Sequence, residues 1–389
     1  MHDQDPIVFS LFIVFTGASL VATLALYARQ ALPVAYILVG VVAGPSVLGL
    51  VSEPELIGGM ADIGILFLLF LLGLDLAPRG LLHMLRKATL VTVLSSLLFA
   101  MLGAAVALAF GYGLVDATVV GGAMMFSSTI IGLKLLPTTA LHHQRMGEII
   151  ISVLLLQDLL AIAILLLLEG LATESGWSAA LLALLGLPAV LAVALGCARY
   201  VLIPLIRRFD KIREYIFLTA IGWCLGIAVL ASLVGVSSHL GAFLAGVALA
   251  TSPIALYIAD SLKPLRDFFL VLFFFSLGAG FELEMLGQVA LPAILLAGLM
   301  VGVKPFTFAR LLAKVGEGGK RGLEIGVRLG QVSEFSLLIA VLALAHGTIS
   351  YQASSLIQAT TVLTFIASTY LVVLRYPTPV AISDRLRRD

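Results

Sequence analysis

Residues 116–136 read DATVVGGAMMFSSTIIGLKLL, an apolar stretch of membrane-span length with consecutive hydroxyl side chains near its middle. The hydroxyls belong to Ser127, Ser128 and Thr129, directly after Phe126. Inside an apolar span, such side chains can satisfy backbone groups that an unwound segment sets free, and their oxygens can bind a hard, partly dehydrated cation. They could instead bond back to their own helix. The stretch therefore favours a broken transmembrane helix.

The rest of the chain has the composition of an integral membrane protein. Of its 389 residues, 61% are hydrophobic and 12% are charged, whereas soluble domains have about half apolar and about a quarter charged residues. A helix needs about 20 mostly apolar residues to cross a bilayer. The windows that we expect to cross it lie at 6–27, 32–50, 60–76, 88–113, 116–136, 147–171, 178–198, 214–235, 237–252, 266–281, 289–309, 322–346 and 353–375.

Lysine and arginine residues fall on one side of this predicted topology. They occupy the loops after the odd-numbered helices and the C-terminus, whereas acidic residues occupy the other loops. Lys304 and Arg328 lie inside helices. Because basic loops stay in the cytoplasm, we expect the N-terminus outside and the C-terminus inside. The bilayer is the expected environment, and the net charge of +1 gives no indication of a nucleic-acid partner.

A second candidate break lies at Gly330–Ser333, in the window 322–346. The regions 88–171 and 289–375 each contain three predicted helices, and an odd helix offset gives them opposite orientations. Each break lies in the middle helix of its group. Interrupted helices at corresponding positions of an inverted repeat are typical of secondary transporters. The expected fold class is therefore an all-α integral membrane protein of about 13 transmembrane helices with an inverted repeat.

Asp158 lies in the middle of the window 147–171, where the sequence reads LLLQDLLAI and only Gln157 is a polar neighbour. An ionisable side chain at membrane depth is unfavourable and is by default a functional candidate. No residue nearby on this helix could neutralise the carboxylate. We therefore expect Asp158 to have a functional role, with a structural carboxylate buried against a partner as the alternative.

Three other ionisable positions have structural alternatives. Glu334 could bind the cation or hold helices together by hydrogen bonds. Lys304 lies deeper than snorkelling to the interface explains, and could be a purely structural ammonium. Arg328 follows Glu324 by one helical turn, so we expect that i,i+4 pair to be structural.

Several motifs along the chain resemble one transporter family. The motifs are Leu32–Leu50, Ile65–Leu76, Phe126–Thr129, Leu240–Val247, Leu272–Gly278 and Gly330–Phe335. Together they resemble the transmembrane domain of the Kef-type potassium/proton antiporters, in the cation/proton antiporter-2 (monovalent cation:proton antiporter) family. The Gln157-Asp158 pair is similar to the Kef type in particular, because sodium-exchanging relatives commonly have two aspartates, or Asn-Asp, there.

The resemblance implies a sodium/proton antiporter-like fold, in which the two broken helices cross, and a homodimer in the bacterial cytoplasmic (inner) membrane. It implies a transmembrane domain at 1–376 whose core bundle is about 88–171 and 289–375, with the other helices as scaffold and dimer contact. A cytoplasmic basic tail would follow at 377–389. Kef-type proteins normally continue into a Rossmann-type nucleotide-binding domain; we expect it to be truncated, absent or supplied in trans.

The resemblance also implies roles for residues of the core. Lys304 matches the core lysine of the family, and the usual aspartate partner of that lysine is Gln157 here. Val332-Ser333 stand where the family frequently has Gly-Gly. The residues expected at the cation and proton site are Asp158, Gln157, Ser127, Ser128 and Thr129, and the expected supporting residues are Lys304, Glu334, Gln331 and Ser333.

These observations predict a secondary active transporter rather than an enzyme. Its substrates would be potassium and protons, exchanged by alternating access, with no cofactor in this chain. A sodium/proton antiporter is the main alternative, because hydroxyl and carboxylate oxygens suit both ions. A gated potassium channel, a sodium-coupled organic-anion symporter and a transport-dead sensor stay open at this point.

Overall fold

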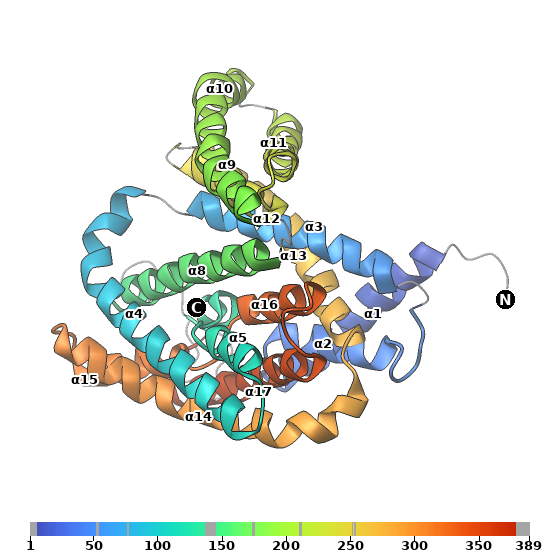
Figure 1. Cartoon of the computed structure of the whole chain (residues 1–389), viewed down its shortest axis with the longest axis vertical. Coiled ribbons are helices and arrows are strands. Elements are labelled where there is room, and N and C mark those ends of the chain that lie inside the picture. The colour runs from blue at the N-terminus through green and yellow to red at the C-terminus, as the bar shows by residue number, and fades with distance from the viewer. Residues whose placement is uncertain are drawn as a thin grey trace. The chain divides into compact units, whose positions relative to one another are not determined.

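The computed structural model describes residues 6–51, 54–75, 78–136, 145–172, 176–209, 212–250, 252 and 254–378. Most of the expected tail at 377–389 lies outside these ranges. The regular elements are helices (Figure 1). The chain forms two compact units, the first made of residues 1–14, 51–82 and 169–276, and the second made of residues 15–50, 83–168 and 277–389.

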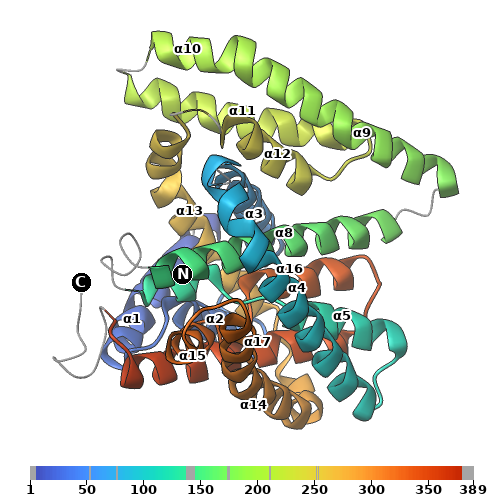
Figure 2. The ribbon, with the colours of Figure 1, turned by 90° about the vertical axis from the view of Figure 1, so that its left-hand side faces the viewer.

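The first unit is built on helices that approach each other through glycine. In it, α12 packs against α3, α9 and α11 (Figure 2). A Cβ atom added to Gly246 would lie 2.1 Å from the backbone oxygen of Phe70, so a side chain at this position would force α3 and α12 apart. Its elements are α3 (Pro54–Asp75), α9 (Gly176–Cys197), a π-helical turn (Ala198–Leu202), α10 (Ile203–Arg208), α11 (Arg213–Leu233) and α12 (Ser238–Ala250).

The second unit contains both interrupted helices. Within it, α14 packs on α15 and α17, while α5 packs on α16 and α17 (Figure 1). Its elements are α2 (Leu32–Ala43), α5 (Leu114–Met124), α6 (Thr129–Lys134), α14 (Leu283–Lys314), α15 (Gly319–Arg328), α16 (Glu334–Ala345) and α17 (Tyr351–Arg375). Helices with residues in both units are α1 (Pro6–Tyr27), α4 (Pro78–Ala109), α8 (Arg145–Ala172) and α13 (Ile254–Ala279).

The number of helical segments matches the predicted number of membrane passages. Within the described ranges, nine helical stretches are long and apolar enough to cross a membrane, and α2, α12 and α16 are shorter apolar helices. Taking α5 with α6, α9 with α10, and α15 with α16 as single segments gives thirteen helical segments in the described chain. The thirteenth is α13, which is outside both groups of apolar helices. The structure therefore confirms the expected all-α membrane fold with two broken helices.

Two helices begin well before the apolar windows that predicted them. α4 begins at Pro78 instead of 88, and α13 begins at Ile254 instead of 266. In α13 the added turns are charged and carry a salt bridge of 2.6 Å between Lys263 and Asp260. Hydropathy locates the part of a helix that lies in lipid, and ion pairs one turn apart let the helix continue beyond it.

Candidate functional site

Both predicted breaks are present in the second unit. The first lies between the end of α5 at Met124 and the start of α6 at Thr129. The second lies between the end of α15 at Arg328 and the start of α16 at Glu334. Each break exposes backbone groups that a continuous helix would satisfy, so each needs partners from elsewhere.

A serine starts the second half of each broken helix. Ser128 is the N-cap of α6, and its Oγ accepts a hydrogen bond from the backbone N–H of Ile131 at 3.1 Å. Ser333 is the N-cap of α16, and its Oγ accepts from the backbone N–H of Phe335 at 3.1 Å. Serine is among the preferred N-cap residues for this reason. Two of the residues expected at the site therefore shape the breaks.

The two breaks lie against each other and are joined by hydrogen bonds. Ser127 donates its hydroxyl to the backbone oxygen of Leu329 at 2.8 Å. In the other direction, the Gln331 amide nitrogen donates to the backbone oxygen of Ser128 at 3.3 Å. These contacts link positions about two hundred residues apart in the sequence, and they put the interrupted segments of both repeats at one place.

Gln157 satisfies the backbone of the first break from α8. Its Oε1 accepts from the backbone N–H of Ser127 at 3.0 Å, and its Nε2 donates to the backbone oxygen of Met125 at 3.2 Å. The side chain is fully buried. In the structure Gln157 is therefore a positioning residue for the break.

Asp158, the next residue on α8, faces the start of α6. Thr129 donates its hydroxyl to the carboxylate, at 3.1 Å from Oδ2 and 3.3 Å from Oδ1. Asp158 is 2% exposed. No salt bridge joins it to a cationic side chain in the described part of the chain. A buried carboxylate without a cationic partner is suited to bind a cation or a proton.

Lys304 reaches both breaks from α14. Its Nζ donates to the backbone oxygens of Phe126 at 2.7 Å and Gln331 at 3.0 Å, and lies 3.5 Å from Ser127 Oγ. The ammonium also lies 5.3 Å from the ring centroid of Phe99, within cation–π range. The structure thus gives this fully buried lysine backbone carbonyl partners.

Glu334 accepts from a backbone N–H group, whereas Lys304 donates to backbone carbonyl oxygens. Glu334 Oε1 accepts from the backbone N–H of Ile130, in the first turn of α6, at 3.2 Å. It is also the first residue of α16. Helix N-termini carry partial positive charge and C-termini partial negative charge. Glu334 therefore lies at the start of two half-helices, while Lys304 lies just after the end of α5 and of α15.

Hydroxyls from other helices complete the second break, and sequence reasoning missed them. On α17, Ser368 donates to Gln331 Oε1 at 2.8 Å, and Thr364 Oγ1 accepts from the backbone N–H of Val332 at 3.0 Å. Ser336 donates to a backbone oxygen of α5. The available signal was the i,i+4 spacing of hydroxyls in an otherwise apolar span, which marks one polar stripe on a helix.

Arg328 ties together the ends of α6, α15 and α17. Its guanidinium pairs with Glu324 at 2.9 Å, as expected. It also donates to the backbone oxygens of Leu135, at the end of α6, and Pro377, after α17, at 3.0 Å and 2.9 Å. The Tyr376 ring centroid lies 5.6 Å from it. This arginine, 2% exposed, is therefore structural and lies apart from the residues around Asp158.

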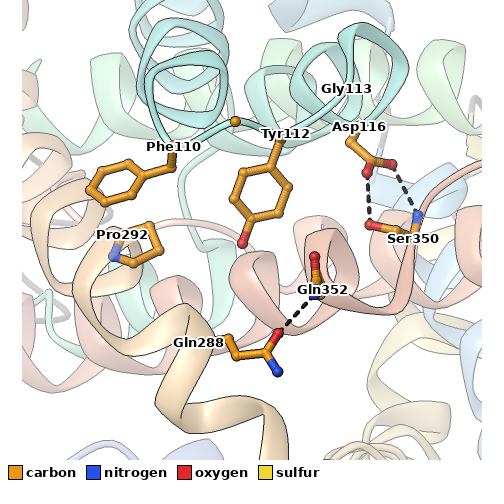
Figure 3. Close-up of a pocket in the computed structure, with 9 residues that line it drawn as sticks. Phe110, Tyr112, Gly113, Asp116, Gln288, Pro292, Ser350 and Gln352 are labelled. Atoms are coloured by element: carbon orange, nitrogen blue, oxygen red, sulfur yellow. Dashed lines mark hydrogen bonds between the residues drawn. The ribbon is translucent and has the colours of Figure 1, made fainter.

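A separate cavity of about 310 Å³ opens beside the α4–α5 connection (Figure 3). Asp116 accepts hydrogen bonds there from the backbone N–H and the hydroxyl of Ser350, at 2.9 and 2.7 Å. Ser350 is in turn the N-cap of α17. Across the cavity, Gln352 donates to Gln288 at 2.7 Å. These contacts anchor the start of α17, and the cavity contains none of the residues expected at the site.

The arrangement can hold one small cation among oxygen atoms at the crossing of the breaks. The described residues contain no group of three or more His, Cys, Asp or Glu side chains placed to hold a metal ion. A carboxylate beside hydroxyl and backbone oxygens is the chemistry of hard cations. Broken helices that cross in the core are the architecture of secondary transporters.

Residues 11–374 match the transmembrane domain of the sodium/hydrogen exchangers. The chain belongs to this family. It is a family of cation/proton antiporters, so the chain is a multi-pass membrane transporter and not an enzyme. The resemblance to the cation/proton antiporters and the expected all-α fold are thereby confirmed.

Three similar proteins show the range within the family. The iron transporter MagA of Paramagnetospirillum magneticum is 30% identical over 88% of this chain and 79% of its own length. The glutathione-regulated potassium-efflux system protein KefC of Klebsiella pneumoniae is 27% identical over 83% of this chain, which spans 53% of that relative. The sodium proton antiporter MjNhaP1 of Methanocaldococcus jannaschii has the same fold, with a TM-score of 0.71, 20% identity, and coverage of 94% of this chain and 95% of that one.

Proposed function

We propose that this exchanger moves potassium in one direction and protons in the other by alternating access, with Asp158 as the carrier. The observation that carries the proposal is the buried Asp158 carboxylate, which faces the break in α5–α6 and, among the described residues, is hydrogen-bonded only by the Thr129 hydroxyl. Potassium is favoured over other cations by the Gln157-Asp158 pair and by the potassium-efflux relative.

In this mechanism, potassium and a proton compete for one carboxylate. Either partner neutralises the buried charge, so the occupied site can pass through a conformational change in the membrane, whereas the empty, charged site is unfavourable there. Thr129 lends a hydroxyl to the carboxylate, while Ser127, Ser128 and Gln157 keep the break open. Lys304, Glu334, Gln331 and Ser333 support the two broken helices.

Sodium and iron are the alternatives to potassium as the transported cation. Oxygen ligands of this kind suit sodium as well as potassium, and a relative that covers most of this chain is named as an iron transporter. The family favours antiport over a gated channel or an organic-anion symporter. The cation is therefore the point to be tested.

The assembly and orientation are further parts of the proposal. The exchanger acts as a homodimer in a bacterial cytoplasmic membrane, with its N-terminus outside and its C-terminus inside. The core bundle is about 88–171 and 289–375, and the basic tail at 377–389 lies in the cytoplasm. Support comes from the distribution of basic residues between the predicted loops and from the family resemblance. Cross-linking in vesicles and protease accessibility of the two termini test these statements.

Asp158→Asn tests the proposal directly. Purified protein in vesicles with an imposed pH gradient should move protons when potassium is added, and the variant should not, because an amide neither ionises nor releases a proton. Asp116→Asn, the same chemical change outside the site, should keep exchange. Sodium, lithium, rubidium and ferrous iron are compared with potassium under the same conditions. Substantial exchange by a correctly folded Asp158→Asn variant would rule out Asp158 as the carrier.

A further inference from the structure

One oxygen of Glu334 has no hydrogen-bond partner. Oε1 accepts from the backbone N–H of Ile130, but Oε2 is buried and receives no hydrogen bond from the described residues. The residue is 3% exposed. Among the described residues, no salt bridge joins its carboxylate to a cationic side chain. Buried carboxylate oxygens normally have donors, so one without any calls for an explanation such as a bound ion.

Glu334 and Asp158 are held by neighbouring residues. Thr129 bonds the Asp158 carboxylate and Ile130 bonds Glu334, so both acidic groups lie at the first turn of α6. Two buried carboxylates at the same helical turn repel each other unless a cation or a proton lies between them.

The structural tasks at the crossing are already assigned to other groups. Ser128 and Ser333 cap the two half-helices, and Ser127 and Gln331 link the breaks. Lys304 points its ammonium at backbone carbonyls. These groups hold the breaks together without Glu334 Oε2. They therefore do not explain why this oxygen is buried without a hydrogen bond from the described residues.

We propose that Glu334 is a second ligand of the transported cation, which lies between Glu334 Oε2 and the carboxylate of Asp158. This inference rests on the proposed function, because it takes Asp158 as the first ligand. Its ligand class is a partly dehydrated monovalent cation, which two carboxylates and nearby hydroxyl oxygens can surround. Glu334 is then a determinant of cation affinity as well as a supporting charge.

Glu334→Gln separates these roles, because the amide oxygen can still accept from Ile130 while the negative charge is lost. The apparent KM for potassium should rise about tenfold or more, the effect of losing one charged ligand, while the rate at saturating potassium changes little. Glu334→Asp keeps the charge but draws it back by one methylene, and should raise KM less. Ser354→Ala, which removes an uncharged link between α17 and α16, should leave KM unchanged.

A binding measurement keeps the inference independent of transport. Potassium, sodium, lithium and rubidium are added to detergent-solubilised protein, and the concentration that half-maximally raises the unfolding temperature is compared between wild type and Glu334→Gln. That concentration should rise in the variant for whichever cation stabilises the wild type, even if the wild type does not exchange potassium. If the Gln variant does not fold, Glu334→Asp is measured in the same way. Unchanged KM and unchanged cation protection, or an equal KM change in Ser354→Ala, would overturn the proposal.

Discussion

Gln157 and Asp158 are neighbours on α8 but present different chemistry to the same break. The glutamine amide both donates and accepts, which matches the backbone oxygen of Met125 and the backbone N–H of Ser127. An aspartate at this position could accept but not donate. The neutral residue thus fixes the backbone, and the charged residue beside it stays available for an ion.

Replacing Gln157 by leucine should destabilise the protein. The substitution leaves a buried N–H and a buried carbonyl without partners, and each such loss costs about 1–3 kcal/mol. Thermal unfolding in detergent measures the change. Gln157→Glu, which keeps only the acceptor, should lie between the leucine variant and the wild type. A leucine variant as stable as the wild type would mean that water replaces the amide.

Among the hydroxyl residues, we expect Thr129 to affect cation binding and Ser127 to affect stability. Thr129→Val keeps the shape but removes the hydroxyl beside Asp158, whose oxygen can bind the cation, so the apparent KM for the cation should rise about three- to tenfold, the effect of about 1 kcal/mol. Ser127→Ala removes the link to Leu329 instead, and should lower stability with less effect on KM. Exchange kinetics in vesicles and thermal unfolding distinguish the two effects. Equal KM changes in both variants would contradict this division.

At the scale of helices, the sequence predicts the two breaks but not the residues that contact them. Consecutive hydroxyls at 127–129 and the Gly330–Ser333 segment predict unwinding from local chemistry alone, and both predictions are confirmed. The partners of Lys304 could not be read in the same way, because Phe126 is 178 residues away and becomes a neighbour only when the broken helices cross. The resemblance supplied that crossing, while the roles expected for the site residues stay predictions.

The packing of α15 on α14 gives a test at this scale. A Cβ atom at Gly326 would lie 2.6 Å from Cα and 2.7 Å from the backbone oxygen of Pro305, and backbone atoms cannot move aside as a flexible side chain can. Gly326→Ala should therefore lower the unfolding temperature, and impair exchange because Lys304 precedes Pro305.

Gly302→Ala is the matched control on α14. Its added Cβ would meet no atom within 4 Å, and alanine is favoured over glycine in a helix by about 0.5–1 kcal/mol. Stability equal to or above that of the wild type is expected. A Gly326→Ala variant that matches this control in stability and exchange would show that α15 can shift away from α14 without loss.

For the whole molecule, the decisive quantity is the charge that crosses the membrane in each cycle. In the core, Arg328 is paired with Glu324, and when the other buried groups are ionised Asp158 and Glu334 are negative and Lys304 is positive. With Lys304 as a fixed charge among carbonyls, the crossing has one excess negative charge. A single potassium ion or a single proton neutralises it, so both loaded forms carry no net charge.

We therefore expect electroneutral exchange of one proton per cation. A site that moved with net charge would couple to the membrane potential by about 2.3 kcal/mol per elementary charge per 100 mV. Here a potential imposed on vesicles by a permeant anion should leave the rate of potassium-dependent proton movement unchanged. The potassium gradient that just balances a given proton gradient should equal it.

The opposite result would identify a second proton carrier. Lys304 contacts backbone carbonyls and Ser127 in the structure, and the residue that would pair with it ionically in two-aspartate relatives is Gln157 here. A steep voltage dependence, or a balance point that requires two protons per cation, would contradict electroneutral exchange. If that voltage dependence then disappeared in Lys304→Gln, the lysine would be the group that releases and regains the second proton in each cycle.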